Sequence, residues 1–154
     1  MLRVWLCVLS LLAVILSVVS PRALHSNSSS SEAENVEAVI GRFFEGWNAH
    51  DANKMVSAYA ADIDHIDVFG EWHKGREVLR EELARLHAGP LRNSQKTFKV
   101  EKIRFIGPDV AVAQVSSNSM NGPNLGTFVL QKQKEGWLTV SFTNVAPHDP
   151  PWKK

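Results

Sequence analysis

The apolar residues beyond the polar stretch near the start of the chain repeat with the spacing of an amphipathic helix. Five apolar side chains occupy positions i, i+4, i+7, i+8 and i+11 of this segment: Val36, Ile40, Phe43, Phe44 and Trp47. At 3.6 residues per turn these positions form one stripe along a helix. We therefore predict a helix from about Glu32 to Asn48 that packs its stripe into the core of the domain.

Two further helices are predicted downstream. Asp51 suits the N-cap of a short second helix, which would bury Met55, Val56 and Tyr59. A third helix is expected from Arg76 to His87, where leucines recur at helical spacing before Gly89-Pro90 ends the pattern.

Alternation with a period of two replaces the helical pattern elsewhere. From Ile63 to Phe69 the residues alternate, so that His65 and Asp67 share one face of a predicted strand. The segment from Gly70 to Gly75 is expected to be a loop. Four later segments, separated by short Gly-rich turns, are also predicted strands: Lys96–Ile106, Val110–Ser119, Leu125–Lys132 and Trp137–Val145.

The order of these elements predicts an α+β fold. The order is helix, helix, strand, helix and then four strands, and the strands joined by short turns form an antiparallel meander against which the helices pack. A strongly curved sheet with helices packed against it leaves a cavity at its open end, where chemistry or binding would take place.

The first twenty residues have a different character from the rest. An apolar run from Val4 to Val19 follows Arg3, and it is shorter than the roughly 20 residues of a membrane-spanning helix. We interpret residues 1–26 as a signal peptide, cleaved between positions 20 and 26, so that the protein would be secreted or periplasmic. An uncleaved signal anchor is the alternative. Residues 27–33 are then a polar tether, and the tail at 148–154 is expected to be loose.

Composition excludes several classes of function. The chain has 17 Lys and Arg against 16 Asp and Glu, and removal of Arg3 and Arg22 with residues 1–26 leaves 15 against 16. A balance this close to zero gives no support for a nucleic-acid partner. Cys7 is the only cysteine, so the chain can form neither an intrachain disulfide nor a thiolate metal cluster.

Several short motifs resemble the nuclear transport factor 2-like superfamily, and in particular its SnoaL-like and SgcJ/EcaC-type members. Trp47-Asn48-Ala49-His50-Asp51 and Tyr59-Ala60-Ala61-Asp62 resemble two helix ends of that family, and Gly75-Arg76 resembles the start of its third helix. The stretch Phe105–Val112, Gly136-Trp137 and Asn144 are similar to its later strands. The resemblance covers residues 34–147. It implies a cone-shaped barrel with a pocket, and frequently a homodimer formed through the sheet.

The resemblance places Asp67 where ketosteroid-isomerase-like members carry a strand-borne aspartate that moves protons. Desolvation in an apolar cavity raises the pKa of a carboxyl group toward the range useful for such chemistry. Those enzymes also carry oxyanion donors, but here the corresponding positions are Phe43 and a site near Thr127 or Phe128. Phe43 cannot donate, so steroid isomerisation itself is disfavoured. The alternative for Asp67 is an ordinary hydrogen-bonded strand acid.

Other residues are candidates for the same pocket. His65, about 7 Å from Asp67 along the strand face, would assist it, or would simply pack at the pocket edge. The predicted ligand-binding wall consists of Phe43, Trp47, Tyr59, Trp72, Gln114, Ser116 and Asn118. No metal site is expected, because the candidate ligands are scattered over different predicted elements: His65, Asp67, His73 and His87. No cofactor motif occurs, so any chemistry would be cofactor-free.

Two functional hypotheses remain open. The first is an exported domain that binds a small, largely apolar ligand in its cone and performs acid–base chemistry of the isomerase, dehydratase or cyclase kind. The second is a non-catalytic ligand-binding or dimeric association module. A cavity lined by Asp67 and larger than about 300 Å³ favours a ligand, whereas a cone filled by Phe43, Trp47 and Phe69 favours the module. Neither hypothesis involves nucleic acid, or a membrane once the signal is removed.

Overall fold

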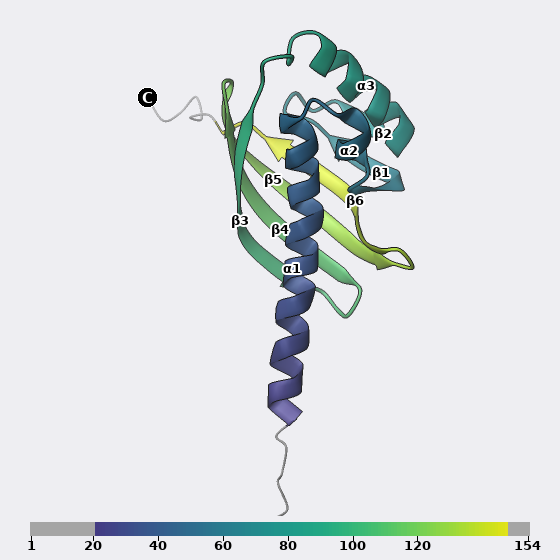
Figure 1. Ribbon diagram of the computed structural model, residues 1–154, viewed down its shortest axis with the longest axis vertical. Coiled ribbons are helices and arrows are strands. Elements are labelled where there is room, and N and C mark those ends of the chain that lie inside the picture. Colours follow the sequence, from purple (N-terminus) through teal and green to yellow (C-terminus); the bar gives the residue numbers. More distant parts are fainter. Residues whose placement is uncertain (1–20, 148–154) are drawn as a thin grey trace, which may run out of the picture.

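Three helices and a six-stranded sheet make up residues 21–147, the part of the chain that the computed structural model describes (Figure 1). The helices are α1 (Pro21–Asn48), α2 (Ala52–Val56) and α3 (Arg76–Ala88). The strands are β1 (Tyr59–Ile66), β2 (Trp72–Lys74), β3 (Lys96–Phe105), β4 (Val110–Ser119), β5 (Gly122–Gln133) and β6 (Gly136–Val145). The predicted α+β class, with helices against a curved sheet, is confirmed, although the sheet does not close into a barrel.

Helix α1 lies across one face of the sheet, while α2 and α3 lie near β1 and β2 (Figure 1). All five residues of the predicted stripe are buried, and the first of them along the chain is Val36. The helix begins at Pro21 rather than near Glu32, so the segment expected to be a tether is helical. Glu32 joins the helix to the sheet, because its carboxylate accepts hydrogen bonds from Lys132 Nζ at 2.7 Å and from the Trp137 indole.

Two of the sequence predictions lie mostly or wholly outside the described residues. They are the signal peptide, apart from its residues 21–26, and the tail at 148–154. Within residues 21–147, no helix is both long enough and apolar enough to cross a membrane.

The sheet has the strand order β2-β1-β6-β5-β4-β3. The four long strands β3 to β6 form the predicted antiparallel meander. Strand β1, however, pairs in parallel with β6, so the sheet is mixed. The segment from Trp72 to Lys74, predicted to be a loop, is strand β2 and pairs antiparallel with β1.

Strand β1 begins and ends earlier than its alternation suggested. Tyr59, expected on the second helix, is the first residue of β1, because α2 ends at Val56 after only five residues. The predicted N-cap is confirmed, since Asp51 Oδ1 accepts a hydrogen bond from the backbone N–H of Lys54. After Ile66 the chain turns, and Gly70 takes a φ of 82° that favours glycine in that turn. Asp67 therefore lies in a turn and not within a strand.

The core lies between α1 and the inner face of the sheet. Phe43 occupies its centre, with ring centroids 5.5 Å from Tyr59, 6.3 Å from Phe128 and 6.0 Å from Phe142. Helix α1 also approaches α2 closely at Gly46, where an added Cβ would stand 2.5 Å from the backbone nitrogen of Met55.

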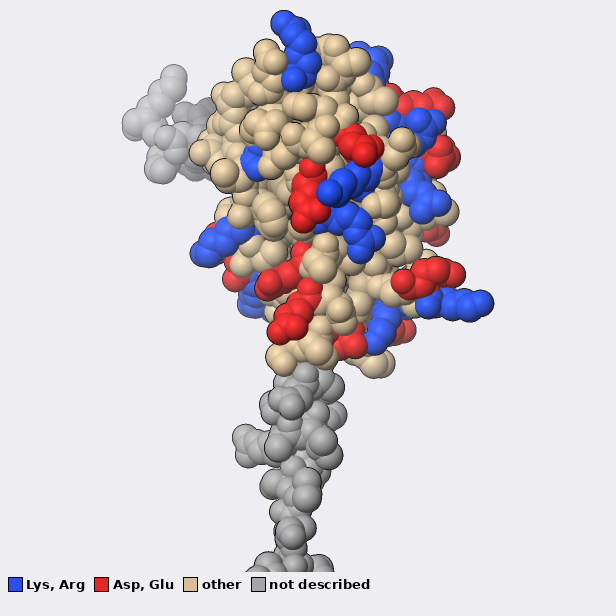
Figure 2. All heavy atoms as spheres, viewed as in Figure 1, with Lys and Arg blue, Asp and Glu red and all other residues tan. Residues whose placement is uncertain are grey.

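Charged side chains are mixed over the face that carries α1. Figure 2 shows acidic and basic residues interspersed there, without a large area of one sign. This distribution agrees with the balanced composition, and it gives no electrostatic basis for binding a polyanion on this face.

Candidate functional site

A cavity of about 530 Å³ lies between the sheet's inner face, α1 and α3. Much of its wall is apolar, with Phe43, Trp47, Leu83, Phe128 and Phe142 among the lining residues. Its volume falls within the range of small-molecule pockets and exceeds the 300 Å³ threshold set above. Phe69, which would have to enter the cone to fill it, is instead 91% exposed. The cone therefore contains space that its own side chains do not occupy.

Asp67 lies in the wall of this cavity, at the turn that follows β1. Its Oδ1 accepts hydrogen bonds from the backbone N–H groups of Phe69, at 2.8 Å, and Glu71, at 2.9 Å. Its Oδ2 stands 3.9 Å from Nε2 of His73, and the side chain is 25% exposed. The turn and the two amides thus hold the carboxylate in a fixed position, with most of its surface removed from water.

His65 projects into the buried side of the cavity from β1. Its side chain is almost fully buried, and its Nδ1 has no hydrogen-bond partner among the described residues. Burial, together with a smaller effect of the neighbouring His73, lowers the pKa of His65 to about 3, although Asp67 opposes the change. The ring is therefore neutral at pH 7, so it can donate or accept one hydrogen bond but carries no positive charge.

His73 is the residue that sequence analysis missed as a partner of Asp67. The pairing of β2 with β1 sets His73 opposite His65, with ring centroids 6.0 Å apart, and places both rings in the cavity wall. Sequence analysis placed His73 in a loop, because a three-residue edge strand is too short to show alternation. The burial of His73 follows from the pairing of β2 with β1, which the sequence pattern does not show.

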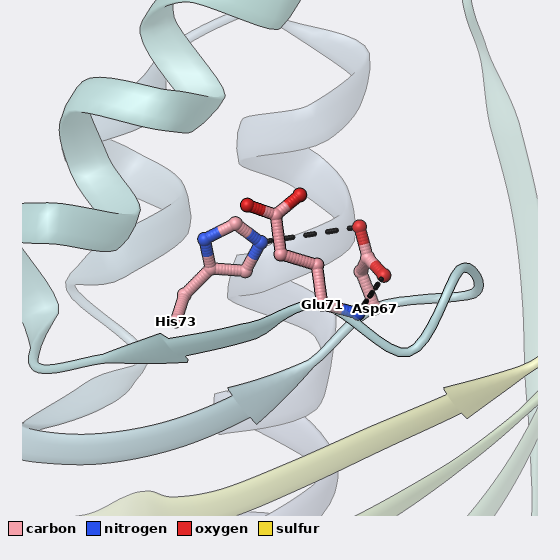
Figure 3. Close-up of side chains that lie close together, drawn as sticks. All are labelled: Asp67, Glu71 and His73. Carbon is pink, nitrogen blue, oxygen red and sulfur yellow. Dashed lines mark hydrogen bonds and ion pairs between the residues drawn. The ribbon is translucent and has the colours of Figure 1, made fainter.

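Asp67, Glu71 and His73 form the cluster drawn in Figure 3, where the three side chains leave the β1–β2 hairpin on the same side. Their ligand atoms lie within 4.8 Å of one another, so the trio has the geometry to hold a cation. Glu71 is exposed and His73 is buried, which makes the cluster a rim of the cavity. His65 and His87, which were considered with Asp67 and His73 in the sequence, are not part of it. The absence of a metal site stays a prediction.

Two of the seven predicted wall residues, Phe43 and Trp47, line the cavity, and the other five do not. Tyr59 is fully buried in the core, where its hydroxyl lacks a hydrogen-bond partner among the described residues. Trp72 is 54% exposed, because it faces away from the cavity and its indole N–H donates to Asp64 Oδ1 at 2.8 Å. Trp72 therefore is not part of the cavity wall.

The three polar residues expected from β4 are on the opposite face of the sheet. Val115, Ser117 and Ser119 line the cavity instead of Gln114, Ser116 and Asn118. Gln114 Oε1 accepts a hydrogen bond from Thr127, and the Ser116 hydroxyl donates to Glu101. Both faces of β4 carry polar side chains, so polarity alone could not distinguish them. The small apolar residues that share the inner face, Ala111 and Ala113, were the signal that could have done so.

Lys96 is a second lining residue that sequence analysis missed. It is the first residue of β3, and its Nζ lies 3.8 Å from the centroid of the Trp47 ring. Burial lowers the pKa of Lys96 to about 8. The described part of the cavity wall thus carries a carboxylate and two histidines from the β1–β2 hairpin, the carboxylate of Glu82 from α3, and an ammonium group from β3.

A family model supports the relationship that the motifs suggested. The model of the SnoaL-like domain matches residues 40–131, more than half of the chain. The match does not distinguish SgcJ/EcaC-type members, so that narrower assignment stays a prediction. No curated protein matches the sequence at a significant level.

Solved structures share the fold at low sequence identity. A domain of unknown function with a cystatin-like fold from Nostoc punctiforme has a TM-score of 0.73 and 16% identity, over 77% of this chain and 79% of that one. A nuclear transport factor 2-like protein from Novosphingobium aromaticivorans has a TM-score of 0.72 and 13% identity, over 89% and 95% of the two chains. A ketosteroid isomerase-like protein from Erwinia carotovora atroseptica has a TM-score of 0.58 and 15% identity, over 73% and 95%. Likeness at these identities concerns the fold, and activity must be argued from the site.

Proposed function

The chain belongs to the SnoaL-like domain family, and on that premise we propose that it binds a small, largely apolar ligand in its cavity and transfers a proton on it without a cofactor. One observation carries the proposal. A cavity of about 530 Å³ with aromatic walls contains a fixed carboxylate, Asp67, beside the two buried imidazoles of His65 and His73. Apolar walls with a few convergent polar groups are typical of small-molecule sites.

Asp67 is the proton acceptor in this proposal. Its Oδ1 is held by two backbone amides, which leaves Oδ2 to face the ligand and His73. His73 is a positioning residue, since its ring stands beside the carboxylate oxygen that would receive the proton. His65, neutral and buried, can donate one hydrogen bond to an oxygen that gains negative charge as the proton leaves.

The proposed reaction differs from steroid isomerisation in its supporting groups. Phe43 and Phe128 lie in the cavity wall and have no hydrogen-bond donors on their side chains. Donors are available from Ser117, Asn124 and Asn144, which also line the cavity. We therefore infer proton abstraction beside a polarised carbonyl group, whose oxygen takes up the negative charge, with a donor arrangement different from the one that the resemblance implies.

The test is exchange of the α-protons of a panel of cyclic and aromatic ketones in D₂O, followed by NMR. We expect Asp67→Asn to slow exchange by about a hundredfold or more, the usual contribution of a general base. Asp64→Asn is the matched control, because Asp64 lies on the same hairpin but bonds to the exposed Trp72. Exchange at the wild-type rate in Asp67→Asn would contradict the catalytic role and leave a binding module.

We also propose that the outer face of the sheet associates with a second copy of the chain. Support comes from uncharged side chains on the face opposite the cavity: Val112, Thr127 and Val129 are partly exposed in the isolated chain, and Leu125 and Val145 are exposed. Register places Leu125 opposite Val145 and Val112 opposite Val129, so these side chains form a continuous strip.

Finally, we propose that the domain is exported, on the strength of the apolar run from Val4 to Val19. Cleavage between residues 20 and 26 would leave the buried stripe of α1, which begins at Val36, intact. The mass of the chain purified from its own host tests this directly. A mass that includes residue 1 would contradict cleavage.

A further inference from the structure

Lys96 lies in the wall of an apolar cavity and has no anionic partner among the described residues. Within residues 21–147, its Nζ takes part in no ion pair and no hydrogen bond, and it rests over the Trp47 ring instead. An ammonium group removed from water costs free energy unless it is paired. The contact with the face of the Trp47 indole offsets part of this desolvation penalty, because a cation is attracted to an aromatic ring.

The surroundings hold this lysine in a defined place. The side chain of Asn48, the last residue of α1, bonds to both backbone groups of Lys96: the Lys96 N–H donates to Asn48 Oδ1 at 2.7 Å, and Asn48 Nδ2 donates to the Lys96 carbonyl at 2.9 Å. The Trp47 ring is also fixed, since its Nε1 donates to Ser94 Oγ at 3.2 Å and His87 packs edge-on at 4.6 Å. Both the ammonium group and its aromatic platform are therefore preorganised.

The neighbouring titratable groups leave the charge of Lys96 uncompensated. His65 from β1 and His87 from α3 both interact with it electrostatically, and burial holds the pKa of His65 at about 3 and that of His87 at about 4. Both rings are therefore neutral at pH 7. Neither carboxylate of the cavity wall pairs with Lys96 among the described residues. Glu82 pairs with Arg85, and Asp67 has its Oδ1 bonded to backbone amides and its Oδ2 beside His73. Lys96 has a pKa of about 8, so it is mainly protonated at neutral pH, and its positive charge is not balanced by these neighbours.

A hydroxyl group lines the same cavity from the neighbouring strand β4. Ser119 is the cross-strand partner of Lys96 and also lines the cavity. Its Oγ accepts a hydrogen bond from the Asn121 N–H at 3.2 Å, so the hydroxyl hydrogen stays available for donation. An ammonium group and a hydroxyl donor in the wall of one cavity suit a carboxylate, which accepts hydrogen bonds at both oxygens.

We propose that the cavity takes an amphipathic carboxylate, whose anionic group binds Lys96 and Ser119 while its apolar body lies against Phe43, Phe128 and Phe142. This inference rests on the proposed ligand-binding function and specifies the class of ligand. The carboxylate end of the ligand lies toward β3, and the opposite end lies toward the β1–β2 hairpin that carries Asp67.

The experiment compares naphthoate with naphthamide, its uncharged analogue of the same shape, by isothermal titration calorimetry at pH 7. We expect the wild-type domain to bind naphthoate about tenfold or more tightly than naphthamide, because hydrogen bonds to a charged group are the stronger ones. Lys96→Met should abolish this preference while the affinity for naphthamide persists. Lys134→Met, which removes an exposed lysine of the β5–β6 turn, should leave the preference intact.

The pH dependence supplies a second readout. The affinity for naphthoate should fall as the pH rises through about 8, where free Lys96 loses its proton, whereas the affinity for naphthamide should stay constant. Lys96→Arg keeps its charge over this range and should keep the preference at high pH. Retained binding of naphthamide by Lys96→Met shows that this variant is folded.

The outcomes separate this inference from the function on which it rests. Equal affinities of the wild-type domain for the two compounds would contradict the carboxylate assignment but would still support binding of an apolar ligand in the cavity. A preference for naphthoate that survives in Lys96→Met would also overturn it. Failure of the wild-type domain to bind either compound would overturn the ligand-binding function itself, and this inference with it.

Discussion

His65 makes the stability of the domain depend on pH. In the unfolded chain this histidine has an ordinary pKa of 6.5, but burial lowers its pKa to about 3 in the folded state. Between these two values the unfolded chain binds a proton that the folded one does not. The free energy of unfolding should therefore fall as the pH falls from about 6.5 toward 3, by up to about 1.4 kcal/mol per pH unit.

Urea denaturation at a series of pH values, on the wild-type protein and on His65→Leu, measures this effect. Leucine fills a similar volume and does not titrate, so the variant should become more stable than the wild-type protein as the medium is acidified. At pH 7 the histidine is neutral in both states, and the difference between the two proteins should be small. Parallel pH profiles for the two proteins would contradict the burial of a neutral ring at this position.

At the residue scale, sequence predicted the centre of the site better than its surroundings. The family resemblance singled out Asp67, and alternation added His65 on the same predicted face; both line the cavity, although Asp67 lies in the turn after β1. His73 and Lys96 were missed for a common reason. Strand pairing brings both residues to the cavity: His73 pairs with β1, and Lys96 pairs with β4. The residues next to them in the sequence do not indicate burial.

At the scale of elements, the approach of α1 to α2 depends on one glycine. A Cβ on Gly46 would stand 2.5 Å from the Met55 backbone nitrogen and 2.9 Å from its Cα, so the two helices must shift to admit it. Gly41 lies in the same helix, but the nearest atom to its added Cβ is Phe98 Cζ at 3.9 Å. The two glycines therefore provide a matched pair of substitutions.

We expect Gly46→Ala to lower the free energy of unfolding by about 2 kcal/mol, as overpacking usually does. Gly41→Ala should instead raise it by about 0.5 to 1 kcal/mol, because alanine is the better helix former. Thermal denaturation followed by circular dichroism compares them. Equal effects of the two substitutions would show that α1 and α2 are not in such close contact.

The elements themselves were predictable where their pattern is long. The stripe of α1 and the span of β4 agree with the prediction because many residues share one periodicity, and the Asp51 cap agrees because aspartate is a preferred N-cap residue. Short elements were less predictable. Three residues of β2 and five of α2 are too few to define a period, and the parallel pairing of β1 with β6 arises from the path of the chain between them rather than from either strand.

At the scale of the whole molecule, the outer face of the sheet determines whether the protein is a dimer. We expect the domain to sediment as a dimer in analytical ultracentrifugation, and Val129→Asp, in the middle of the proposed interface, to sediment as a monomer. The control is Val78→Asp, because Val78 is exposed on α3 and lies outside the sheet. A monomeric wild-type protein, or a dimeric Val129→Asp variant, would contradict association through this face.

Native mass spectrometry of the mature domain, purified from its own host, tests most directly whether the cavity holds a ligand. We expect a species whose mass exceeds that of the polypeptide by one small molecule per chain, and this additional mass should disappear under denaturing conditions. A bare polypeptide mass under native conditions, together with no binding of either naphthoate or naphthamide, would contradict it. The cavity of about 530 Å³ would then be a feature of the fold without a ligand to fill it.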